Sequence, residues 1–282
     1  MMNGVDRSQV RSSVIAGSWY PSQPEELRSI VERYLDNVEP TELEGELVGL
    51  IAPHAGYAYS GQVAAYAYKQ LEDLDFNLVA LISPLHRVRL GTYMVTSYSY
   101  YETPMGLMPV DTELVKALGE ELELTRVRRD QEHSLEIQLP FLQYMLGEFR
   151  LLPIMMGDQD WSSCQSLASA LASLLSGEKA LLVATTDLSH FHSYDQAVQL
   201  DQRVQERVGA FDPRGLSEDL AARRSEACGG GPVISMMLAA QELGASQAHV
   251  LHYANSGDVT GDRSRVVGYM AAALLKADGR TE

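Results

Sequence analysis

Histidine, cysteine and aspartate side chains stand where they could bind a metal ion or move a proton. His54 and His86 each follow a proline that ends an apolar segment, in the sequences IAPH and SPLH. Another apolar segment ends just before Asp187 and His190, and Cys228 precedes three glycines. Imidazole and thiolate are good ligands for Zn²⁺, Fe²⁺ and copper. These residues are therefore candidates for a metal centre or an acid–base site.

Each candidate also has an ordinary structural interpretation. A lone histidine at a strand end is more often a core residue with a satisfied hydrogen bond, and Cys228 could be a small buried residue before a glycine turn. The matching positions of His54 and His86 favour the ligand interpretation. The glycines after Cys228 predict bare backbone N–H groups and a helix dipole near its sulfur, which favour thiolate. Cys164 lies on the apolar face of an expected helix and is interpreted as core packing.

Two other histidines stand near these segments. His133 precedes Ser134, the expected first residue of a helix, and is a further candidate for the site. His192 is interpreted as a surface residue, because His190 lies nearer the end of the apolar strand.

The candidate residues need a scaffold that gathers them. Continuous apolar segments of strand length alternate along the chain with segments of helical spacing. These strands are expected at residues 47–52, 77–83, 150–156 and 179–185. Such alternation is typical of a parallel sheet covered by helices on both faces. We predict a three-layer α/β/α fold with a central, mainly parallel or mixed sheet. Loops at the carboxyl ends of its strands would converge on one crevice.

Further elements follow from periodicity and from helix start signals. The first helix is expected to begin at residues 22–25 and to end near residue 37. Further helices are expected at residues 62–71, 111–121, 134–147, 160–175, 194–209, 213–223 and 229–243. Additional strands are expected at residues 92–100, 247–254 and 265–275. Pro140 must either kink the helix over 134–147 or lie where its missing N–H is not needed.

Composition limits the class of protein. The chain has 282 residues, of which 45% are hydrophobic, and no linker-like tract, so we predict one domain over residues 1–282. A formal net charge of −16 argues against a nucleic-acid partner. Apolar runs fall well short of the about 20 residues that span a bilayer, so no membrane association is expected. Two cysteines and no secretory signal indicate a reducing, cytoplasmic location.

Seven segments, read in order, resemble the Memo family. They are AGSWYP (16–21), APHAGYAYSG (52–61), SPLH (83–86), EHSLEIQLP (132–140), TTDLSHF (185–191), CGGGP (228–232) and YANSGDVTGDRSRVVGY (253–269). These segments span nearly the whole chain. They are similar, more narrowly, to the prokaryotic branch of the family, the protein B component of the AmmeMemoRadiSam system.

The resemblance implies a fold like that of class III extradiol dioxygenases, in which two histidines and one carboxylate hold Fe²⁺. In the Memo family the pattern becomes two histidines and a cysteine, which fall here on His54, His86 and Cys228. These three residues are called the ligand group below. A thiolate in place of the carboxylate softens the site, so copper and zinc compete better with iron.

The resemblance also implies roles for three neighbouring residues. The acid–base histidine of the dioxygenases falls on His190, and another pocket histidine falls on His133. Asp187 matches an acidic position of the family's pocket. Whether Asp187 replaces or supplements Cys228 as the anionic ligand is left open by the sequence. Mammalian members are associated with phosphotyrosine-peptide binding and with metal-dependent redox chemistry.

Three functions are therefore compared. The leading hypothesis is metal-dependent redox or dioxygenase-like activity on an unknown small molecule, with Fe²⁺ or copper on the ligand group. In it His190 is the acid–base residue, oriented by Asp187, and His133 lines the substrate site. The alternative is a non-enzymatic module whose crevice binds a peptide or a partner, such as the companion proteins of the AmmeMemoRadiSam system. A third hypothesis is Zn²⁺-assisted hydrolysis.

Overall fold

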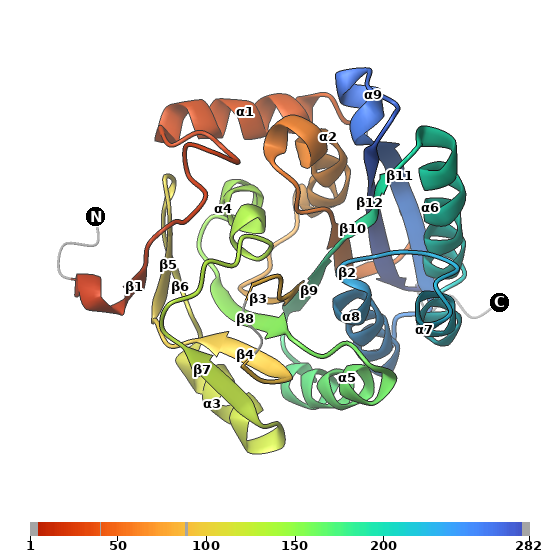
Figure 1. The fold of residues 1–282 in the computed structure, drawn as a ribbon. Helices are drawn as coiled ribbons and strands as arrows, with labels where there is room; N and C mark the ends of the chain where they lie inside the picture. Colours follow the sequence, from red (N-terminus) through yellow and green to blue (C-terminus); the bar gives the residue numbers. More distant parts are fainter. Residues whose placement is uncertain (1–4, 40, 88–89, 278–282) are drawn as a thin grey trace.

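The computed structural model describes residues 5–39, 41–87 and 90–277. Within them a main sheet of nine strands is covered by helices, and a small sheet of three strands lies at one side (Figure 1). The main sheet contains β2 (Glu46–Ala52), β3 (Leu78–Pro84), β4 (Tyr93–Thr96), β7 (Leu124–Val127), β8 (Arg150–Met156), β9 (Ala180–Thr185), β10 (Asp187–His192), β11 (Gln247–Asn255) and β12 (Val266–Lys276). The small sheet contains β1 (Val10–Arg11), β5 (Tyr100–Thr103) and β6 (Gly106–Pro109).

Helices connect most of these strands. The α-helices are α1 (Pro24–Asp36), α2 (Tyr57–Tyr68), α3 (Thr112–Glu121), α4 (Leu139–Leu146), α5 (Trp161–Leu175), α6 (Tyr194–Gly209), α7 (Pro213–Ala221), α8 (Gly230–Glu242) and α9 (Ser256–Thr260). Short 3₁₀ helices are η1 (Arg7–Gln9), η2 (Lys69–Leu71) and η3 (Glu136–Gln138). None of the helices in the described residues is long and apolar enough to cross a bilayer.

The main sheet is mixed. Its strand order is β10-β12-β2-β9-β3-β8-β4-β7, and β11 pairs with β12. The central strands β2, β9, β3 and β8 run parallel to one another, whereas β12 is antiparallel to β2 and β4 is antiparallel to β8. The predicted α/β class with a mainly parallel or mixed sheet is confirmed.

Helices cover both faces of this sheet. On one face α2 packs against β2, β11 and β12, with α1 and α4 beside it. On the other face α8 packs against β2, β3 and β9, flanked by α5 and α7 (Figure 1). The remaining long helix, α6, packs against β10, β11, β12 and α7. The sheet and the two helical layers form the expected three-layer arrangement.

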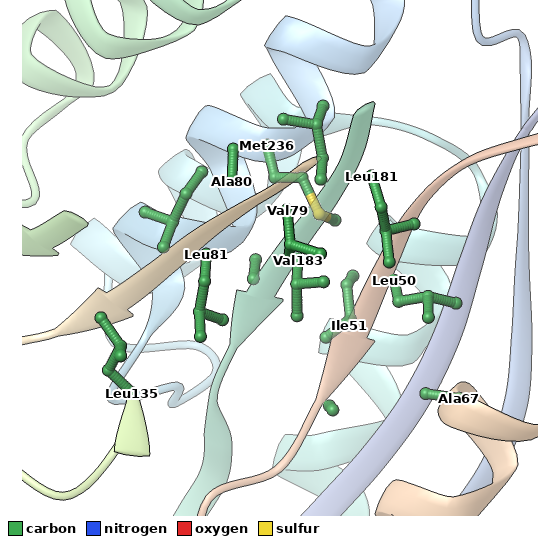
Figure 2. Packing of buried hydrophobic residues seen from close by; sticks show 14 of the residues in the cluster. Leu50, Ile51, Ala67, Val79, Ala80, Leu81, Leu135, Leu181, Val183 and Met236 are labelled. Atoms are coloured by element: carbon green, nitrogen blue, oxygen red, sulfur yellow. The ribbon is translucent and has the colours of Figure 1, made fainter. Parts of the chain in front are cut away.

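The central strands are apolar at nearly every position because both of their faces are buried. Leu50 and Ile51 of β2, Val79 of β3 and Val183 of β9 are fully buried. Figure 2 shows these side chains on their strands, together with Met236 of α8. A strand covered on both faces cannot alternate apolar with polar residues. This explains why the predicted bounds of these strands agree closely with the observed ones.

Two sequence expectations are refined by the structure. Residues 187–192, for which no strand was predicted, form β10, which pairs antiparallel with β12. Register shifts in this pairing disturb the alternation that would reveal a strand. The helix expected over 134–147 is divided into η3 and α4, and Pro140 lies in the first turn of α4. Proline is tolerated there because its missing N–H would have no helical partner.

Candidate metal centre and cleft

Three candidate side chains lie just beyond the carboxyl ends of adjacent parallel strands. His54 follows β2, Asp187 follows β9 and His86 follows β3, and these strands are neighbours in the order β2-β9-β3. Parallel neighbours end at the same edge of a sheet, so their loops meet. The fold therefore brings residues that are distant in sequence to one edge.

The ligand group is compact. The Sγ atom of Cys228 lies 3.1 Å from Nε2 of His54. One ligand atom from each of His54, His86 and Cys228 lies within 4.8 Å of the other two. The His54 and His86 rings are 5.1 Å apart, centroid to centroid. The expected juxtaposition of two imidazoles and one sulfur is observed, and these distances suit ligands of a single ion.

The hydrogen bonds of His54 fix which ring nitrogen carries the proton. Its Nδ1 lies 3.0 Å from Oγ1 of Thr185. The Thr185 hydroxyl donates its proton to the carbonyl of Ala52 at 2.8 Å, so it must accept from His54. Nδ1 is therefore protonated and Nε2 presents a lone pair toward Cys228. Burial, followed by the nearby His86, lowers the pKa of His54 well below its ordinary value, so the ring is neutral.

A carboxylate holds the proton on Nδ1 of His86. Its Nδ1 lies 2.9 Å from Oε1 of Glu132, and its backbone N–H donates to Oε2 at 2.6 Å. Burial alone would raise the pKa of Glu132, but hydrogen bonds from His86 and Ser134 outweigh it and lower the pKa to about 2. An ionised carboxylate only accepts hydrogen bonds, so Nδ1 of His86 is protonated. Nε2 is left as the ligand atom.

Cys228 differs from the sequence expectation. Burial, followed by the charge of Asp187, raises the pKa of its thiol well above the ordinary range. Gly229 donates to Thr186 Oγ1 and Gly231 donates to Gln159 Oε1, and the lowering of the thiol pKa by the Gly229 N–H is outweighed by burial. The thiol therefore keeps its proton, with the unprotonated Nε2 of His54 at 3.1 Å and the carbonyl of Asp187 at 3.5 Å as its acceptors. A cation bound here would take the place of this proton.

Asp187 lies beside the ligand group without belonging to it. Its Oδ1 accepts the backbone N–H of His54 at 2.7 Å, and its own N–H donates to Sγ of Cys228 at 3.3 Å. Burial raises its pKa to about 6. Among the described residues, the close-set group around His54 contains Cys228 and not Asp187. The geometry thus favours sulfur as the anionic ligand.

The remaining candidates line the same cleft. Nδ1 of His190 lies 2.8 Å from the carbonyl of Leu188 and is therefore protonated, which leaves Nε2 to accept a proton. The Leu188 carbonyl, rather than Asp187 as expected, orients this ring. His133 packs against Trp19 with ring centroids 4.2 Å apart. Burial lowers the pKa of His133 to about 4, so it is neutral near pH 7.

The cleft has a volume of about 510 Å³. Asp187 and four histidines line it, namely His54, His86, His133 and His190. The aromatic side chains of the lining are Trp19, Tyr59, Phe191 and Tyr269. Arg265 is the single arginine or lysine of this lining among the described residues. Phe191 has a positive φ of 64°, which is unusual for a residue with a side chain, and its ring is 61% exposed. The Arg265 guanidinium lies 5.1 Å from the centre of that ring. The cleft is large enough for a small molecule.

Two residues that hold the histidines were not identified from the sequence. Thr185 closes an apolar strand and has the ordinary appearance of a core residue. Glu132 stands next to His133 in a polar loop, and that adjacency was the one available signal. Its partner His86 lies 46 positions away, so the contact is not visible in a local pattern.

Comparisons with known proteins agree with this architecture. The family model described as "Memo-like protein" matches residues 11–273. A "MEMO1 family protein" of Methanosarcina acetivorans is 39% identical over 267 residues, which is 93% of this chain and 98% of that protein. A relative from Methanosarcina mazei is 38% identical with the same coverage. The crystal structure of an uncharacterized protein from Escherichia coli K12 shares the fold, with a TM-score of 0.52, 13% identity, and coverage of 80% of this chain and 99% of that one.

Proposed function

The chain belongs to the Memo family, and we propose that His54, His86 and Cys228 hold one Fe²⁺ or copper ion that supports redox chemistry on a small molecule in the cleft. One observation carries the proposal. Both imidazoles keep their proton on Nδ1, and Nε2 of His54 already faces a cysteine sulfur at 3.1 Å. Neutral imidazole nitrogen is the form that binds metal, and the Cys228 thiol would release its proton when the ion binds.

The residues present fit such an ion. Metal–nitrogen distances near 2.0 Å and metal–sulfur distances near 2.3 Å place nitrogen and sulfur roughly 3.5 Å apart around a tetrahedral ion. The observed separation of 3.1 Å needs only a small outward movement of the Cys228 side chain. Two nitrogens and one sulfur suit copper and zinc as well as Fe²⁺. The proposal names Fe²⁺ or copper, with Zn²⁺ as the competing ion.

The residues of the cleft would have separate roles around the bound ion. When bound, the ion would supply electron transfer and open coordination positions. His190 is the proton acceptor in the proposal, because its Nδ1 proton is held by Leu188 and its Nε2 has a lone pair. His133, neutral near pH 7, provides a polar wall, and Trp19 shields it from water. Asp187 keeps the backbone of His54 in place.

A second proposal treats the cleft as a binding site for a peptide or a partner protein. Exposed aromatic rings favour it, since Phe191 is 61% exposed and Tyr59 is 47% exposed. Companion proteins of the AmmeMemoRadiSam system are the proposed partners. Binding that persists after His54→Ala and Cys228→Ala are combined would support this module over the metal enzyme.

The metal proposal is tested by elemental analysis of protein purified without chelators. We expect about one equivalent of iron, copper or zinc in the wild type and a loss of at least tenfold in Cys228→Ala. Cys164→Ala is the matched control, because Cys164 is buried and bonded to backbone carbonyls of Gln159 and Gly231 rather than to a histidine. Equal metal content in the wild type and Cys228→Ala would overturn the proposal.

A further inference from the structure

The Glu132 side chain receives an unusual number of hydrogen bonds. It is 1% exposed. Oε2 accepts the backbone N–H of His86 at 2.6 Å, and Oε1 lies 2.9 Å from Nδ1 of the same residue. Oε1 also accepts the N–H groups of His133 and Ser134 at 3.0 and 3.1 Å, and the Ser134 hydroxyl at 2.9 Å. Every one of these partners is a donor, so the site is built for a carboxylate.

His86 depends on this carboxylate more than His54 depends on any one group. Among the hydrogen bonds of the described residues, both that involve His86 end on Glu132. His54 has two different partners: its ring contacts the Thr185 hydroxyl, and its backbone N–H donates to Asp187. The His86 ring is also 30% exposed, so packing restrains it less than the buried His54 ring.

Glu132 itself is held rigidly. Nη2 of Arg11 donates to the Glu132 carbonyl at 2.7 Å, and Arg11 is only 3% exposed. The Ser134 hydroxyl also lies 3.0 Å from the carbonyl of Pro84, the last residue of β3. The segment carrying Glu132 is thereby tied to the strand end from which His86 extends.

We propose that Glu132 is the positioning residue of His86: it fixes the rotation of the ring, keeps the proton on Nδ1 and so directs Nε2 toward the sulfur of Cys228. The inference rests on the proposed metal centre. A carboxylate behind a metal-bound imidazole also increases the basicity of the ligating nitrogen. His54 has a neutral hydroxyl in the corresponding place, so the two histidine ligands would not be equivalent.

A competing assignment makes Glu132 a metal ligand. Atoms of His86, Glu132 and His133 also lie within 4.8 Å of one another. However, five donor groups already lie within 3.1 Å of the carboxylate, and a cation would have to displace them. This favours the positioning role, and the competing assignment predicts a second metal ion that a titration would detect.

The test uses Co²⁺ as the probe, because its absorption spectrum reports ligand type. We expect wild-type protein to bind one Co²⁺, and Glu132→Gln to bind it 10- to 100-fold more weakly with an altered visible spectrum. Glu132→Asp keeps the charge and should recover part of the affinity. Glu102→Gln is the matched control, because Glu102 pairs with the exposed Arg7 and does not contact the ligand group, and it should leave the affinity unchanged.

A double-mutant cycle separates positioning from general stability. If Glu132 acts through His86, then Glu132→Gln should cause no further loss of Co²⁺ affinity in a His86→Ala background. An equal loss in both backgrounds, unchanged affinity in Glu132→Gln, or two Co²⁺ ions per wild-type chain would each overturn the inference. If Glu132→Gln fails to fold, Glu132→Asp enters the same cycle.

Metal-free protein provides a readout that does not depend on the proposed function. ¹⁵N NMR of the His86 ring should report a protonated Nδ1 in the wild type and a mixture of tautomers in Glu132→Gln. A wild type that binds no Co²⁺ would overturn the metal centre, whereas the NMR result would still decide whether Glu132 controls the ring. An identical tautomer in both proteins would contradict the positioning role.

Discussion

At the scale of single residues, the chemistry of this site is set by hydrogen-bond partners rather than by residue type. Three histidines carry their proton on Nδ1 for different reasons: a threonine hydroxyl at His54, a carboxylate at His86 and a backbone carbonyl at His190. In each ring Nε2 is left as the nitrogen that can bind a metal ion or a proton. A carboxyl group of the same site, Asp187, is buried in a position that is unfavourable to its charged form.

Asp187→Asn should stabilise the metal-free protein. Burial raises the pKa of Asp187 from 3.8 to about 6, so its ionisation destabilises the folded state above about pH 6 and has no effect well below pH 4. Asparagine can still accept the His54 N–H. We expect the free energy of unfolding at pH 8 to rise by up to about 3 kcal/mol, and the gain to shrink as the pH falls toward 4.

Urea denaturation in the presence of a chelator, at pH 8 and at pH 4, measures this difference. Asp75→Asn is the control, since the side chain of Asp75 is 91% exposed and its change should stay within about 0.5 kcal/mol. A loss of stability in Asp187→Asn at pH 8 would contradict the assigned cost of burying this carboxylate.

At the scale of elements, the start of α8 is pressed against the end of β9. Gly229, the residue before α8, has no room for a side chain: a Cβ atom there would lie 2.1 Å from the carbonyl oxygen of Thr185 and 2.9 Å from Cβ of Thr186. Cys228 is the preceding residue, so the close approach of helix and strand sets the position of its sulfur. The glycine run is needed for packing rather than to supply free N–H groups.

Gly229→Ala should therefore disrupt the ligand group. The added methyl would clash with backbone, which cannot rotate away as a side chain can, so α8 and Cys228 must shift. We expect a loss of about 1–3 kcal/mol in the free energy of unfolding, together with at least tenfold weaker Co²⁺ binding. Thermal melting and a Co²⁺ titration measure the two effects.

Gly119→Ala serves as the matched control. It lies in α3, and its Cβ would come no closer than 3.6 Å to Leu124. Alanine should leave Co²⁺ binding unchanged there and raise stability slightly, by roughly 0.5–1 kcal/mol, because it favours helix. Unchanged Co²⁺ affinity in Gly229→Ala would show that packing at this glycine does not position the sulfur.

At the scale of the whole molecule, a buried polar cluster joins the N-terminal segment to the loop that carries Glu132 and His133. Arg11 forms ion pairs of 2.6 Å with both Asp130 and Glu136. Glu136 also accepts the Tyr20 hydroxyl at 2.7 Å and backbone N–H groups of the N-terminal segment. The chain has a net charge of −16, so a buried arginine that neutralises two carboxylates matters for stability.

Arg11→Met should destabilise the fold strongly. It would leave two buried carboxylates without their cation, and breaking a buried pair typically costs about 3–5 kcal/mol. Arg7→Met is the control, because the Arg7–Glu102 pair is exposed and should contribute less than about 1 kcal/mol. Urea denaturation of both variants provides the comparison. Similar losses in the two variants would mean that the cluster does not stabilise the fold as described.

The sequence by itself determined the secondary structure of the sheet centre and the identities of the candidate ligands. Residues 150–156 were predicted as a strand and form β8 with the same bounds, because a strand buried on both faces must be apolar throughout. His54, His86 and Cys228 were identified from their positions after strands or before a helix, together with the family resemblance.

The tertiary structure alone decided how these residues interact. Cys228 and His54 are 174 positions apart, and their contact depends on the strand order and on the packing of α8 against β9. The protonated thiol, the role of Glu132 and the orientation of His190 likewise depend on burial and on hydrogen-bond partners brought by other segments. Local patterns reveal strands because their periodicity is local, whereas protonation and ligand geometry result from contacts between distant parts of the chain.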